Sequence, residues 1–147
     1  MPVGAGADAH GLPGCGVLHG VLGELDHRLG DPLGVQLGLD VGHLGELLPF
    51  NVWRTDHRVA VAPRGIDIQH SFGHYLRNNF YLTTSGNFRT PALLNTIQEV
   101  GADRLLFSAD YPFEDMREAA DWFDRLEIND NDHVKIARTN AQALLKL

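Results

Sequence analysis

One imidazole and one carboxylate lie close enough in this sequence to work as a pair. His43 and Glu46 are three residues apart in the segment 42–46, GHLGE, so in the first turn of a helix they share a face. There a neutral imidazole can accept or relay a proton while the carboxylate fixes its tautomer. The residues alone leave an alternative open, in which Glu46 only favours the helix dipole and His43 only packs.

A second carboxylate, Asp110, follows the apolar run 104–109 and precedes Pro112, which stops that run. This pattern is typical of a buried parallel strand that presents an acid at its carboxyl end. In a (β/α) barrel that end of the strand carries the chemistry. The alternative is that Asp110 caps the next turn or helix.

Other polar residues give weaker signals. Arg54 could bind a substrate carboxylate as a bidentate fork, or form a surface salt bridge or a subunit contact. The sequence has eight histidines, but those before residue 40 lack HxH or HExxH spacing. No serine lies in a Gly-x-Ser-x-Gly turn, so we expect no serine triad.

The elements that must position these residues alternate between helices and strands after His43. Thr90, Pro91 and Gly101 mark the two ends of a helix over 90–100, and aromatic and β-branched residues indicate a strand over 79–84. Such alternation predicts an α/β fold with a parallel sheet. The other expected helices are 44–60, 70–78, 114–126, 132–145 and, weakly, 17–29; the other expected strands are 35–41 and 104–109.

Composition narrows the function further. The chain has 147 residues and a net charge of −7, which disfavours nucleic acid as a partner because phosphate binding needs clustered Lys and Arg. No apolar stretch is long enough for a bilayer span, and no secretory signal precedes residue 40. The single cysteine fits a reducing compartment, so we expect a cytoplasmic protein without membrane or nucleic-acid partners. Glycine is concentrated before residue 45, and we expect 1–40 to be a Gly-rich irregular segment.

Four segments can be read together: 42–54 (GHLGELLPFNVWR), 76–88 (LRNNFYLTTSGNF), 107–114 (FSADYPFE) and, in the tail, 134–141 (VKIARTNA). In this order they closely resemble the C-terminal part of the metal-dependent aromatic acid decarboxylases of the amidohydrolase superfamily. The nearest relatives look like the γ-resorcylate and 2,3-dihydroxybenzoate decarboxylases. The resemblance covers about 43–147.

The resemblance implies an incomplete TIM (β/α) barrel, formed by 41–147, and non-oxidative decarboxylation of a hydroxybenzoate-like aromatic acid at a divalent metal ion (zinc, manganese or magnesium). Asp110 matches the family's metal-site aspartate, which is thought to protonate the ring carbon that loses its carboxylate. His43 and Glu46 match the histidine–glutamate pair beside it. Arg54 and Phe113 match substrate-pocket positions, with the arginine reaching a neighbouring subunit of a homo-oligomer.

The sequence also departs from the family. The acid-x-His metal motif of the first strand and a further metal histidine of a mid-barrel strand are absent, and 1–40 does not match the family. We therefore expect a truncated or mis-assigned start, and low or no activity of this chain alone. Two alternatives remain: a metal-dependent hydrolase of the same superfamily, or a non-catalytic fragment that associates with other chains through an open sheet edge.

Overall fold

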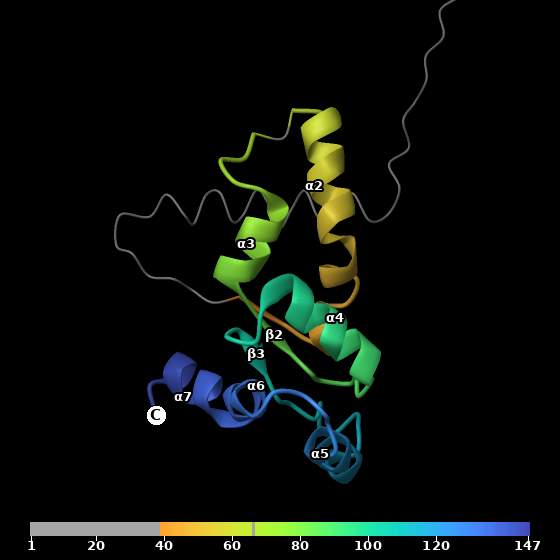
Figure 1. The fold of residues 1–147 in the computed structure, drawn as a ribbon, viewed down its shortest axis with the longest axis vertical. Helices are drawn as coiled ribbons and strands as arrows, with labels where there is room; N and C mark the ends of the chain where they lie inside the picture. The colour runs from red at the N-terminus through yellow and green to blue at the C-terminus, as the bar shows by residue number, and fades with distance from the viewer. Residues whose placement is uncertain (1–38, 66) are drawn as a thin grey trace, which may run out of the picture. The chain divides into compact units, whose positions relative to one another are not determined.

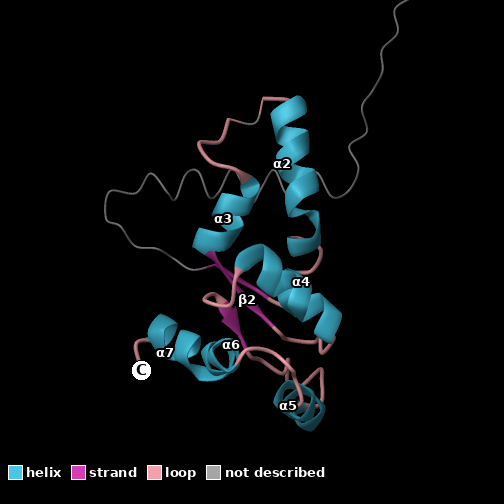
Figure 2. Cartoon of the chain, in the orientation of Figure 1, coloured by secondary structure: helices cyan, strands magenta, loops and turns pink. Residues whose placement is uncertain are grey.

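The computed structural model describes residues 39–65 and 67–147. Within them, three short strands form a parallel sheet in the order β1-β2-β3, drawn in magenta in Figure 2. β1 (Leu39–Val41) pairs with β2 (Phe80–Thr83), and Leu82 of β2 pairs with Leu105 of β3 (Leu105–Leu106). The predicted α/β class with a parallel sheet is confirmed. The incomplete TIM barrel expected over 41–147 and the boundary near residue 40 stay predictions.

Helices connect and follow these strands (Figure 1). Four lie between β1 and β2, two of them short 3₁₀ turns; one lies between β2 and β3, and the remainder follow β3. No helix in the described ranges is long and apolar enough to cross a bilayer. The helices are η1 (His43–Gly45), η2 (Pro49–Asn51), α2 (Val52–Val61), α3 (Phe72–Asn79), α4 (Thr90–Val100), α5 (Met116–Asp124), α6 (Asp130–Val134), η3 (Lys135–Thr139, a π-helical turn) and α7 (Asn140–Leu145).

The predicted helix over 44–60 is wrong in its first half. Residues before Val52 form two separate 3₁₀ turns, η1 and η2, and a regular α-helix begins only there. The predicted strand over 35–41 is described from Leu39 onward. Its first residues, and the expected helix over 17–29, lie outside the described residues.

The predicted helix over 90–100 is confirmed, with one correction at its start. Gly101 ends α4 with φ of 82°, a conformation that glycine adopts without steric cost. Thr90, however, does not cap the helix, because Arg89 occupies the N-cap position. The Thr90 hydroxyl instead accepts a hydrogen bond from the indole N–H of Trp122 at 3.1 Å, which ties α4 to α5.

The last predicted helix forms with a different buried face. The sequence pattern places Val134 and Leu145 inward, yet their exposed fractions are 47% and 63%. Ile136 and Asn140 are buried in their place. The π-helical turn η3 lies between Val134 and Leu145, and it interrupts the regular α-helical period on which the predicted buried face depends.

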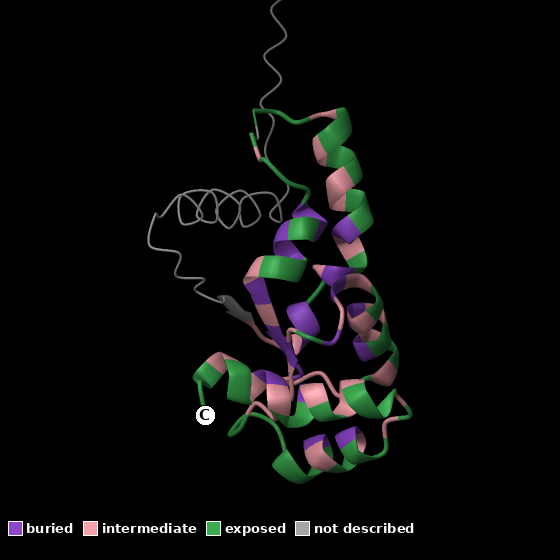
Figure 3. Cartoon of the chain, turned by 60° about the vertical axis from the view of Figure 1, so that its left-hand side comes forward, coloured by how far each residue is buried: buried purple, intermediate pink, exposed green. Residues whose placement is uncertain are grey.

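The core of the described part surrounds β2. Figure 3 shows buried residues on β2 and on parts of the surrounding helices, while much of α2 is exposed. The most deeply buried leucines of the core are Leu44, Leu76, Leu82, Leu93 and Leu105.

Candidate functional site

The carboxyl ends of the three parallel strands bring the candidate residues together. His43 follows β1 after one glycine, and Asp110 lies four residues beyond β3. The segment from Thr84 to Gly86 leaves β2 between them. Because parallel strands end at the same edge of a sheet, these segments meet there.

The segment 43–46 forms a left-handed turn. The φ angles of His43, Leu44, Gly45 and Glu46 are 50°, 57°, 78° and 55°, and the amide of Glu46 donates to the carbonyl of His43 at 3.1 Å. In a 3₁₀ turn the side chains at i and i+3 lie on the same side. His43 and Glu46 therefore share a face, as the sequence predicts, although the turn is not the first turn of an α-helix.

Tertiary contacts hold this turn in place. A left-handed conformation costs roughly 1–2 kcal/mol for each non-glycine residue, so it persists only where the surroundings fix it. Leu44 is 2% exposed, and its carbonyl accepts a hydrogen bond from the Thr96 hydroxyl of α4 at 3.3 Å. The side-chain amide of Asn87 donates to the His43 carbonyl at 3.5 Å. The side chain of His43 is 46% exposed, so it lies outside the buried core, and its role stays a prediction.

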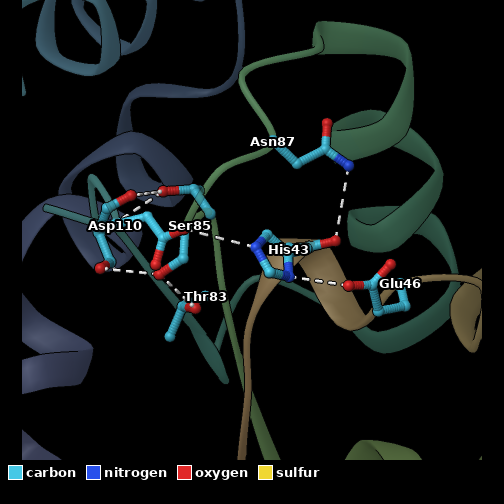
Figure 4. A network of polar contacts seen from close by, with 8 residues as sticks. His43, Glu46, Thr83, Ser85, Asn87 and Asp110 are labelled. Carbon is cyan, nitrogen blue, oxygen red and sulfur yellow. Dashed lines mark hydrogen bonds and ion pairs between the residues drawn. The ribbon is translucent and has the colours of Figure 1, made fainter. Parts of the chain in front are cut away.

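The His43 ring lies between two carboxylates (Figure 4). Its Nδ1 is 2.8 Å from Oε1 of Glu46, and its Nε2 is 3.5 Å from Oδ2 of Asp110. A hydrogen bond from Nδ1–H to Glu46 leaves Nε2 to exchange a proton on the side of Asp110. The arrangement can move a proton between the imidazole and Asp110 and can stabilise the imidazolium that this produces.

Asp110 occupies a constrained position in the backbone. Its φ is 68°, and its carbonyl accepts hydrogen bonds from the amides of Phe113 at 2.9 Å and Glu114 at 3.2 Å. Its side chain does not cap the next helix, because Asp115 is the N-cap of α5. The carboxylate, 31% exposed, is instead directed at His43.

The side chains of Arg54 and Phe113 are both exposed in the described structure. Arg54 is exposed on α2, and no hydrogen bond or ion pair within 39–65 and 67–147 joins it to the cluster. Phe113 is 84% exposed in the loop after Asp110. Their predicted contact with substrate stays a prediction.

The described side chains do not by themselves form a metal site. No group of three or more His, Cys, Asp or Glu side chains that could hold an ion occurs among them, whereas a catalytic zinc site uses three protein ligands. Asp110 and His43 are two possible ligands at most. The histidines before residue 40 lie outside the described residues.

Sequence reasoning missed the contribution of the segment that follows β2. Gly86 (φ of 64°) packs against His43 and Asp110, and the Thr84 hydroxyl donates to the Ser108 carbonyl in the segment that leads to Asp110. The run of small and hydroxyl residues 83–86, TTSG, is the signal that could have identified them, yet it reads equally well as ordinary turn chemistry.

Comparison with known proteins identifies the family. Residues 73–147 match the family model described as amidohydrolase. The chain belongs to the amidohydrolase family. This confirms the resemblance expected from the sequence motifs.

The amidohydrolase chain has close relatives among aromatic acid decarboxylases. It is 50% identical over 115 residues to the gamma-resorcylate decarboxylase of Rhizobium sp. (strain MTP-10005), which covers 76% of this chain and 35% of that protein. Two crystal structures are similar over 75% of this chain, each with a TM-score of 0.70: 2,6-dihydroxybenzoate decarboxylase complexed with 2,6-dihydroxybenzoate (49% identity, 35% of that chain) and dihydroxybenzoic acid decarboxylase from Polaromonas sp. JS666 with bound manganese and the inhibitor 2-nitroresorcinol (48%, 34% of that chain). The chain thus spans about a third of the length of its relatives.

Proposed function

We propose that this chain carries part of the active site of a decarboxylase that removes CO2 without oxidation from a hydroxybenzoate-like aromatic acid. The observation that carries this proposal is the contact series Glu46–His43–Asp110, with distances of 2.8 Å and 3.5 Å. The similarity to decarboxylases of 2,6-dihydroxybenzoate supports the class of substrate.

The proposed reaction is a proton transfer coupled to loss of CO2. Asp110, as a carboxylic acid, donates its proton to the ring carbon that bears the carboxylate. The bond from that carbon to the carboxylate then breaks, its electron pair restores the aromatic ring, and CO2 leaves. His43, whose side chain is partly exposed, takes up a proton from water and passes it from Nε2 to the Asp110 carboxylate, while Glu46 stabilises the imidazolium through Nδ1–H.

Substrate binding is assigned to two further residues. A planar guanidinium suits a carboxylate that needs two parallel hydrogen bonds, so we assign Arg54 to the acid group of the substrate. Since Arg54 is exposed on α2, we propose that it serves the site of a second copy in a homo-oligomer. Phe113, exposed beside Asp110, would pack against the aromatic ring.

The metal requirement is also part of the proposal. A relative with bound manganese supports a divalent ion, and Asp110 would be one ligand. Because the described residues supply too few ligands, we propose that this chain alone binds the ion weakly and turns over slowly. A cytoplasmic location, expected from the single cysteine, belongs to the same proposal.

The test compares product formation by three proteins. Wild-type chain, Asp110→Asn and Asp121→Asn are incubated with 2,6-dihydroxybenzoate and Mn²⁺, and resorcinol is measured by chromatography. Asp121 lies exposed on α5, so its variant controls for the loss of one charge. We expect slow resorcinol formation by wild type and Asp121→Asn and none above background by Asp110→Asn. Equal rates in all three, or no product from wild type, would refute the proposal.

A further inference from the structure

The backbone between β3 and Asp110 depends on one buried side chain of the neighbouring strand end. β3 ends at Leu106, and the next amide, that of Phe107, turns away to donate to the carbonyl of Ile136 at 2.9 Å. The regular ladder between β2 and β3 therefore stops before it reaches Asp110. Some other contact must fix the chain that carries the carboxylate.

Thr84 supplies that contact. Its amide donates to the carbonyl of Leu106 at 3.0 Å. Its hydroxyl donates to the carbonyl of Ser108 at 2.7 Å and accepts from the amide of Ser108 at 2.9 Å. One side chain thus satisfies both backbone groups of Ser108, as a paired strand residue would. The Thr84 side chain is fully buried, so water does not compete for these bonds.

This double hydrogen bond lies two residues before Asp110. On the other side of Asp110, the amide of Phe113 donates to the Asp110 carbonyl at 2.9 Å. Asp110 therefore lies between two hydrogen-bonded positions of the backbone, Ser108 and Phe113, and its own φ is 68°. If the hydrogen bonds between Thr84 and Ser108 are lost, the backbone at Asp110 can relax from this unfavourable conformation. The carboxylate would then move away from His43.

We propose that Thr84 is a positioning residue, which sets the backbone path to Asp110 and, through it, the placement of the carboxylate beside His43. The consequence for turnover rests on the proposed function; the consequence for the backbone does not. Thr84 would lower the barrier of the chemical step and leave substrate affinity nearly unchanged, because the hydrogen bonds of its side chain go to the backbone of Ser108.

Two substitutions separate the hydroxyl from the shape of the side chain. Thr84→Val keeps the volume and removes the hydroxyl, whereas Thr84→Ser keeps the hydroxyl and removes one methyl group. Thr83→Val is the matched control, because Thr83 is also buried and donates to the Ser85 hydroxyl at 3.1 Å, with no hydrogen bond to Ser108 in the described structure.

Two readouts are needed. The first is backbone NMR: hydrogen exchange of the Ser108 amide and the three-bond HN–Hα coupling of Asp110. The second is kcat and KM for 2,6-dihydroxybenzoate with Mn²⁺. We expect Thr84→Val to lose Ser108 protection, to change the Asp110 coupling and to lower kcat by about tenfold or more with little change in KM. Thr84→Ser and Thr83→Val should keep Ser108 protected, and Thr84→Ser should restore kcat.

The outcomes distinguish this inference from the proposed function. Retained Ser108 protection and an unchanged Asp110 coupling in Thr84→Val would overturn the inference, whatever the activity. If wild type forms no resorcinol, the proposed function fails while the backbone readout still decides the role of Thr84. If Thr84→Val does not fold, hydrogen exchange in the wild-type protein tests the inference. Fast exchange of the Ser108 amide would overturn it. Protection of that amide in both wild type and Thr84→Ser would support it.

Discussion

Gly86 fits against the ring of His43 so closely that no other residue has room there. A Cβ added at Gly86 would lie 2.6 Å from Cδ2 and 2.8 Å from Nε2 of the His43 ring, and 3.1 Å from Oδ2 of Asp110. The backbone at Gly86 also has φ of 64°. This glycine therefore forms the surface against which the imidazole and the carboxylate meet.

Gly86→Ala should separate His43 from Asp110 and destabilise the chain. The positive φ alone costs roughly 1–2 kcal/mol for a residue with a Cβ, and the contact with the ring adds to that cost. We expect a lower free energy of unfolding in urea and a loss of decarboxylation.

Gly65→Ala is the matched control for this substitution. Gly65 also has a positive φ, 81°, but a Cβ there would meet nothing within 4 Å. The Gly65→Ala variant should lose stability only because alanine is unfavourable at a positive φ, and it should keep its activity. Equal losses of stability in the two variants, with activity kept in both, would show that Gly86 does not support the cluster.

Glu46→Gln should lower activity with little effect on stability. The Glu46 and His43 side chains are 66% and 46% exposed, and an exposed pair of this kind contributes at most about 1 kcal/mol. Glu46 would act by fixing the Nδ1–H tautomer of His43 and by stabilising the imidazolium. We therefore expect Glu46→Gln to lower turnover on the order of tenfold. Rates of resorcinol formation and urea unfolding curves measure the two effects. Glu127→Gln, also exposed, is the control, and an undiminished rate in Glu46→Gln would contradict the assigned role.

The cap of α5 gives the chain a pH-dependent stability near the site. Hydrogen bonds from the backbone amides of Glu118 and Arg117 hold the pKa of Asp115 below its ordinary value of 3.8. A depressed folded-state pKa means that the carboxylate stabilises the fold above its unfolded-state pKa, and that this stabilisation is lost as the pH falls through the folded value.

Asp115→Ala should therefore be less stable than wild type at neutral pH, and the difference should shrink as the pH falls below about 4. Thermal unfolding at several pH values measures it. Asp115→Asn keeps a good capping side chain without the titrating group, so it should lose less stability at neutral pH. A wild-type advantage over Asp115→Ala that grows on acidification would contradict this assignment.

Much of the secondary structure could be predicted because local signals and tertiary contacts agree there. Pro91 and Gly101 bound α4 as their conformational preferences require. The left-handed turn at 43–46 could not be predicted, since His43, Leu44 and Glu46 all avoid positive φ when isolated. One of the contacts that hold it comes from Thr96 of α4, 52 residues further along the chain than Leu44.

The cluster of candidate residues could be predicted in part for the same reason. The spacing of His43 and Glu46 and the end of the strand before Asp110 are visible in the sequence. The placement of Asp110 beside His43 follows from the parallel strand order, which alternation of helices and strands predicts. The supporting contacts of Thr84 and Gly86 depend on three-dimensional packing between β2 and the segment after β3, and the local pattern at 83–86 fits an ordinary turn equally well.

Metal titration tests whether the described ligands are enough. Isothermal titration calorimetry of this chain with Mn²⁺ or Zn²⁺ should show weak binding without clear stoichiometry, because no group of three ligands occurs in 39–65 and 67–147. Asp110→Asn should weaken it further. Tight, stoichiometric binding would mean that other residues complete the metal site. It would refute the proposal that turnover is slow because the chain has too few metal ligands.

The central claim, that Asp110 delivers a proton to the ring carbon, is tested most directly by isotope incorporation. Wild-type chain is incubated with 2,6-dihydroxybenzoate and Mn²⁺ in D₂O, and the resorcinol is analysed by mass spectrometry and proton NMR. The account predicts resorcinol with one deuterium at the carbon between the two hydroxyl groups, formed by wild type and not by Asp110→Asn. Deuterated resorcinol formed equally fast by Asp110→Asn, or the absence of product from wild type, would contradict it.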